Sequence, residues 1–116
     1  MSRREEQLRR FCQWLRQMSR DCMRLGWFRG DARIEWALKY IVGSLENNPK
    51  AIAWLYITFV SDKRLSEPTW DSAEFERKRL RLRAAAVTGQ PPDALIYLYS
   101  RFARVLAQTT TMQHAR

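Results

Sequence analysis

The side chains best suited to chemistry in this sequence are arginines, because the usual catalytic groups are sparse. The stretch RKRLRLR, residues 77–83, places five basic side chains in seven positions with no acid among them. The single histidine, His114, lies near the end of the sequence. No serine, threonine or cysteine has a histidine or lysine at a spacing that suggests a nucleophile and its base. The pattern therefore predicts a binding protein rather than an enzyme.

Length, composition and net charge predict one globular domain with an anionic partner. The chain has 116 residues, of which 46% are hydrophobic, and it contains five tryptophans. This is enough for one core and too little for two. The formal net charge is +9, and only four of the 21 basic residues are lysines. Arginine binds phosphate and carboxylate in bidentate geometry, although a GC-rich genome also raises arginine content. A charge this high favours nucleic acid as the partner.

The remaining residue types predict no metal, no cofactor and no small-molecule substrate. On one helix, Cys12 and Cys22 would lie about 15 Å apart along the axis, which is beyond disulfide reach. The sequence has neither a CxxC pair nor a Cys/His cluster. Residues 1–25 contain seven arginines and no apolar signal region, and the apolar run 51–60 is too short to cross a bilayer. We therefore expect a cytoplasmic protein that does not associate with membranes.

Hydrophobic periodicity predicts an all-α domain, a compact bundle of about five helices without a sheet. The expected helices are 3–25, 31–46, 49–61, 71–87 and 93–108, followed by a frayed tail over 108–116. The helix 49–61 has apolar residues in every direction and is expected to be the buried centre of the bundle. A buried strand is the alternative for the ten residues 51–60.

Capping residues predict where these helices begin. Asp31 is a good N-cap for the second helix, and Asn48 followed by Pro49 is typical of the start of a third. Asp71 and Glu74 resemble a capping box at the start of the fourth. That start favours a helix rather than an edge strand for RKRLRLR.

The expected fourth helix has two opposed apolar lines with basic residues between them. Leu80, Ala84 and Val87 are expected to face the core, and the opposite line is expected to contact another subunit. The predicted protein interface consists of Phe75, Arg79, Leu82 and Arg83. The basic residues expected to point toward phosphate are Arg77, Lys78 and Arg81.

Two other helices carry candidate nucleic-acid-binding residues. The face of the first helix that is expected to be exposed carries Arg9, Arg16, Arg20 and Arg24. The last helix aligns an aromatic ring with two arginines, at Tyr97, Arg101 and Arg104. A ring beside two arginines suits a stacked base with its phosphates, as in single-strand binding. The alternative for each set is an ordinary solvated helix face.

Large aromatic side chains are numerous for a chain of this size. The set comprises Trp14, Trp27, Phe28, Trp36, Trp54, Tyr56 and Trp70. Tryptophan, tyrosine and arginine are enriched in interface hot spots. The set predicts either a dense core or a subunit of a larger assembly.

A short, basic, helical chain that ends in ALIYLYSRFARVLA (residues 94–107) resembles the small-subunit family of CRISPR effector complexes. The resemblance lies in size, charge and helix content, and it includes no diagnostic motif. It implies a helical subunit of a ribonucleoprotein that holds single-stranded nucleic acid or an RNA–DNA hybrid without sequence preference. Its partners would be nucleic acid and other protein subunits. The alternative is a phage- or plasmid-encoded protein that binds and inhibits a host protein machine.

Overall fold

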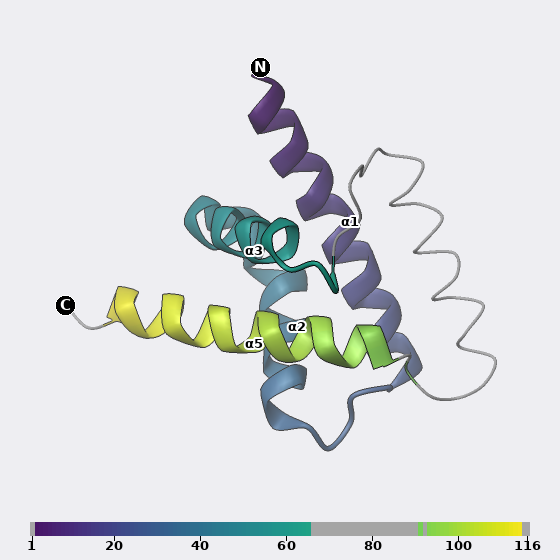
Figure 1. Cartoon of the computed structure of the whole chain (residues 1–116). Coiled ribbons are helices and arrows are strands. Elements are labelled where there is room, and N and C mark those ends of the chain that lie inside the picture. Colours follow the sequence, from purple (N-terminus) through teal and green to yellow (C-terminus); the bar gives the residue numbers. More distant parts are fainter. Residues whose placement is uncertain (1, 66–90, 92, 115–116) are drawn as a thin grey trace.

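The described part of the chain is built from four α-helices and one 3-10 turn. The computed structural model describes residues 2–65, 91 and 93–114 (Figure 1). The elements are α1 (Arg3–Leu25), α2 (Ala32–Gly43), η1 (Leu45–Asn47), α3 (Pro49–Ser61) and α5 (Asp93–His114), and these ranges include no strand. The all-α class is confirmed, with four α-helices in these residues where about five were expected for the chain. The expected helix 71–87 lies outside the described residues.

Helix α1 begins and ends where its sequence predicts. The Ser2 hydroxyl accepts a hydrogen bond from the Glu5 amide at 3.1 Å, which caps the first turn. At the other end, Gly26 adopts φ 67°, a left-handed conformation that glycine tolerates without a steric penalty. The apolar stripe between these caps is buried at Phe11, Cys12, Trp14, Leu15, Met18 and Cys22. Both cysteines are free thiols, in agreement with their spacing.

Helix α2 begins at the predicted cap and ends earlier than predicted. The Asp31 carboxylate accepts a hydrogen bond from the Ile34 amide at 3.1 Å. The α-helix stops at Gly43, and the chain tightens into η1 instead of continuing to residue 46. Glycine lowers helix propensity by about 1 kcal/mol relative to alanine, which favours an end at this position. The buried face still extends across the break, because Leu45 is fully buried in η1.

A hydrogen-bonded corner joins α2 to α3. The Asn48 side-chain oxygen accepts from the Ala51 amide at 3.2 Å, and its side-chain nitrogen donates to the Tyr40 hydroxyl at 2.6 Å. Pro49 then occupies the first helical turn, where its missing amide hydrogen costs nothing. The predicted helix 49–61 is therefore confirmed, and the strand alternative is wrong.

The expected burial of α3 on all sides is wrong. This helix buries one side through Ala51, Leu55 and Phe59, while Trp54 and Ile57 on its outer side are 56% and 46% exposed. Its described neighbours are α1, η1 and α5. An apolar sequence alone does not show how many sides of a helix have neighbours.

Helix α5 continues past the expected frayed tail. It extends to His114 rather than ending at 108. The hydroxyl groups of Thr109 and Thr110 donate to the carbonyl oxygens of Val105 and Leu106, at 2.9 and 2.7 Å. Because these hydroxyl groups bond to carbonyl oxygens of the same helix, the threonines are compatible with a helix that continues through them.

Aromatic side chains form the centre of the core. The Phe11 ring from α1 lies 5.3 Å from both Tyr56 and Phe59 of α3 and 6.3 Å from Phe102 of α5, measured between ring centroids. Figure 1 shows α5 crossing α2, and α2 also packs against α1. Each long helix therefore places one side in the core and leaves the other for solvent or a partner.

Candidate nucleic-acid interface

The four arginines expected on an open face of α1 have different environments. Arg9 is exposed, and its guanidinium contacts Glu6 at 2.6 Å, which lowers the pKa of that carboxyl. Arg24 lies 3.8 Å from Asp21. Arg20 is exposed and has no ion pair within the described residues. Within the described residues, Arg20 is therefore unpaired, and Arg24 is 69% exposed despite its contact with Asp21.

Arg16 is not part of an open arginine face, which corrects the expectation from the helical wheel. Its side chain is 21% exposed and lies against the end of α2. One guanidinium nitrogen donates to the Val42 carbonyl oxygen at 3.2 Å, and the other lies 3.1 Å from the Glu46 carboxylate. The residue thus joins α1 to the turn after α2. Wheel arithmetic missed this contact because it does not include neighbouring helices.

Tyr97 and Arg101 are brought together around an acid that the sequence reasoning did not select. The Tyr97 hydroxyl donates to Asp62, and Arg101 lies 3.7 Å from the same carboxylate. The Tyr97 hydrogen bond is the largest cause of the lowered pKa of Asp62, followed by the backbone amide of Arg64. The Arg64 guanidinium carbon lies 5.1 Å from the centre of the Tyr97 ring. This arrangement joins the end of α3 to α5 and places a cation over the ring where a base was expected to stack.

Arg104, the third predicted residue of this line, lines a groove of about 850 Å³ between α2 and α5. Small side chains on α5 leave the space open, at Ser100, Ala103 and Ala107. From the other helix, Arg33 and Trp36 line the same groove. Both arginines are exposed, and neither has an ion pair within the described residues.

Trp36 supplies the aromatic surface of this groove. Its side chain is 38% exposed. The ring is supported from within the helix by Tyr40, whose ring centroid lies 5.6 Å away at an interplanar angle of 37°. Sequence reasoning placed Trp36 among the surplus aromatics and missed Arg33. The available signal was an arginine three residues before a tryptophan, which puts both on one helix face.

One acid, Asp31, is among the described residues that line the groove, and its carboxylate also caps α2. Asp31 borders it, and its carboxylate accepts the capping hydrogen bond from the Ile34 amide. Gln108 and Thr110 add neutral polar groups to the rim. Within the described residues, the groove therefore offers two cations and one exposed indole beside a single carboxylate, that of Asp31.

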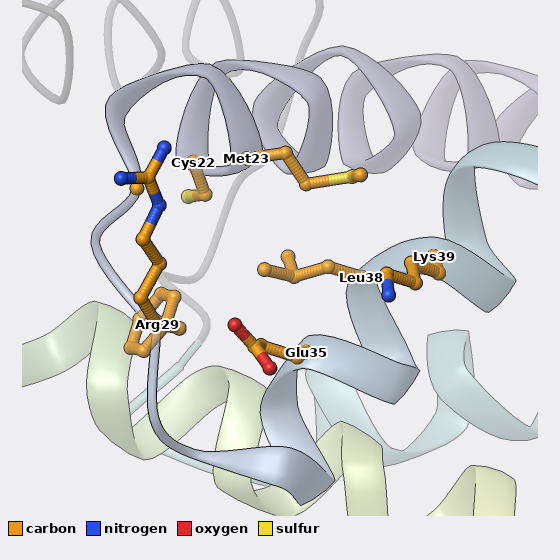
Figure 2. Close-up of a pocket in the computed structure, with 8 residues that line it drawn as sticks. Cys22, Met23, Arg29, Glu35, Leu38 and Lys39 are labelled. Atoms are coloured by element: carbon orange, nitrogen blue, oxygen red, sulfur yellow. The ribbon is translucent and has the colours of Figure 1, made fainter.

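A second, smaller cavity of about 110 Å³ lies between the end of α1 and the middle of α2 (Figure 2). Arg29, Glu35 and Lys39 surround it, and Cys22 faces it from α1. Burial raises the pKa of Cys22 to about 12, so the thiol is neutral at physiological pH and a poor nucleophile. This cavity does not favour covalent chemistry.

Seven of the predicted site residues lie outside the described residues. They are Phe75, Arg77, Lys78, Arg79, Arg81, Leu82 and Arg83. Within the described ranges, no group of three or more acidic, histidine or cysteine residues is arranged to hold a metal ion. None of the helices in those ranges has the length and apolar character that crossing a bilayer requires.

Comparison of the chain with protein-family models, curated proteins and solved structures finds no match.

Proposed function

We propose that this protein binds single-stranded nucleic acid without sequence preference, as a non-enzymatic subunit of a larger ribonucleoprotein assembly. The observation that carries the proposal is the groove between α2 and α5, where Trp36 lies with Arg33 and Arg104. Its volume of about 850 Å³ lies within the range of ligand-sized clefts, roughly 300–1,000 Å³.

Tryptophan and arginine would contact different parts of a nucleic-acid strand. An exposed indole stacks on the face of any base, and such stacking contributes about 1–3 kcal/mol per base. Arg33 and Arg104 would hold the phosphates on either side through charge-assisted hydrogen bonds. Neither contact depends on which base is present, which accounts for binding without sequence preference.

The charge of the rest of the molecule supports an anionic ligand. The described ranges contain 15 basic and eight acidic residues. Arg20 and Arg24 add two exposed basic side chains on α1. A strand is more suitable than a duplex, because stacking on Trp36 requires an unpaired base.

The proposal is tested by fluorescence anisotropy with labelled 20-nucleotide strands of DNA and RNA and with a duplex of the same length. Single strands should bind more tightly than the duplex. Arg33→Ala combined with Arg104→Ala should lower the affinity at least about tenfold, whereas Arg10→Ala, which removes an exposed cation of α1, should change it less than about twofold.

Two replacements of Trp36 separate stacking from simple bulk. Trp36→Phe retains an aromatic face and should keep most of the affinity, while Trp36→Leu should lose about 1–3 kcal/mol of binding free energy. Circular dichroism would show that each variant is folded. Folded variants that bind all three ligands as tightly as the natural sequence would overturn the proposal.

A further inference from the structure

Helix α3 presents an apolar face on the side opposite its core contacts. Trp54, Ile57 and Val60 are 56%, 46% and 44% exposed, at successive positions i, i+3 and i+6. They account for three of the seven large hydrophobic residues that are exposed in the described ranges. Side chains three residues apart lie on one face of a helix, so the three make a continuous stripe.

Burying this stripe is favourable, and its three side chains remain 44–56% exposed among the described helices. The core contacts of α3 come from Ala51, Leu55 and Phe59 on its other side. Removing apolar surface from water stabilises an association in proportion to the area that is buried. Contiguous exposed apolar residues of this kind mark interaction surfaces on monomeric proteins.

The charged residues around this face of α3 indicate which kind of partner would bind there. Lys50 lies on the same face, one turn before Trp54, and the exposed Lys63 and Arg64 follow the last turn. The segment Pro49–Ser61 contains no acidic residue. The side chain of Asp62, just beyond it, is only 12% exposed and contacts Arg101.

A second copy of the chain fits this face poorly. In an antiparallel pair, Lys50 of each copy would lie beside Lys63 and Arg64 of the other, and in a parallel pair the lysines would oppose each other. Each chain also carries a formal net charge of +9. Like charges facing each other across an interface lower its stability.

A nucleic-acid strand is also a poor occupant. Trp54 offers a ring for stacking, but Ile57 and Val60 provide neither an aromatic face nor a hydrogen-bonding group. Apolar side chains at i, i+3 and i+6 instead match the packing of one amphipathic helix against another.

We propose that the α3 face formed by Lys50, Trp54, Ile57 and Val60 docks an acidic amphipathic helix of a partner protein. Apolar residues of the partner pack on Trp54 and Ile57, and its acidic residues lie near Lys50 at one end and Lys63 and Arg64 at the other. These ends are 13 residues apart, about 20 Å at 1.5 Å per residue. The docked segment therefore has three to four helical turns. This inference does not depend on nucleic-acid binding.

The probe is a synthetic 18-residue peptide with leucine at i, i+3 and i+7 positions and glutamate on its remaining faces. A second peptide has the same leucines and lysine in place of glutamate. Fluorescence anisotropy with the full chain should detect binding of the glutamate peptide and at least tenfold weaker binding of the lysine peptide. Equal affinity for both would overturn the charge argument.

Substitutions on α3 and on α1 test whether the glutamate peptide binds to α3. Ile57→Asp and Trp54→Ala should each weaken binding of the glutamate peptide at least about tenfold. Met23→Asp, at an apolar position on α1 that is 40% exposed, should not. The α3 variants should also keep the single-strand affinity of the natural sequence. Peptide binding that survives both α3 substitutions overturns the proposal. Loss of nucleic-acid binding in Ile57→Asp would also overturn it. The same holds if sedimentation equilibrium detects a dimer of the natural sequence that Ile57→Asp abolishes.

Discussion

At the scale of single residues, the core contains a small polar network that is fully buried. The Ser19 hydroxyl donates to the Leu15 carbonyl oxygen at 2.7 Å, so the Tyr99 hydroxyl, 2.8 Å away, must be the donor to Ser19. Burial raises the pKa of Tyr99 well above its ordinary value of 10.0. Burial also raises the pKa of Cys22, whose side chain is 1% exposed. Burial disfavours the charged forms of both Cys22 and Tyr99.

The alkaline stability of the fold should therefore depend on Cys22. The folded state holds the pKa of this thiol at about 12, whereas 9.0 is the ordinary value expected in the unfolded chain. Above about pH 9 the unfolded chain loses a proton that the folded chain keeps, so the free energy of unfolding should fall between pH 9 and 12. Urea unfolding at pH 7 to 11 measures this. Cys22→Ala, although less stable at pH 7, should lose less stability over that range, and identical pH profiles would show that the thiol is not held neutral.

At the scale of elements, Arg16 joins α1 to the end of α2, whereas Arg20 on the same helix makes no such contact with a described element. Arg16 extends from α1 to the Val42 carbonyl oxygen and the Glu46 carboxylate. Arg20, one turn later, is exposed. The two arginines appear equivalent on a helical wheel of α1 alone, yet their structural roles are different.

Alanine substitutions should separate these roles. Arg16→Ala leaves a partly buried carbonyl without its charged donor, and hydrogen bonds to charged groups contribute about 1.5–3 kcal/mol. We expect a loss of about that size in the free energy of unfolding, measured in urea. Arg20→Ala is the matched control and should change it by less than about 0.5 kcal/mol. Equal effects of the two substitutions would contradict the assignment of Arg16 as a link between elements.

At the scale of the whole molecule, the basic surface should make binding dependent on salt. Neutralising phosphates releases counterions, and the slope of log K against log salt is about −0.7 for each contact with a single strand. Removing Arg33 and Arg104 together should therefore make the slope less steep by about 1.4. Titrations of labelled single strands at several salt concentrations between about 50 and 200 mM measure both slopes. A slope near zero for the natural sequence would favour the alternative, a protein that binds a host protein machine.

The sequence by itself determined the local features of the fold. Ser2, Asp31, Asn48 and Pro49 set the starts of three helices, and Gly26 sets the end of α1. Caps and periodicity depend on hydrogen bonds and side chains within a few residues, so they are readable without tertiary structure. The spacing of Cys12 and Cys22 excluded a disulfide because the rise of a single helix places them about 15 Å apart.

Tertiary structure alone decided which helix faces are covered. It made Arg16 a link between helices, engaged Tyr97 with Asp62 and Arg64, and left the outer side of α3 exposed. It also brought Arg33 and Trp36 of α2 to the same groove as Arg104, although about 70 residues separate them in the chain. The side of a helix that is buried depends on where the other helices cross it, and crossing geometry is set by packing across the whole core rather than by any one segment.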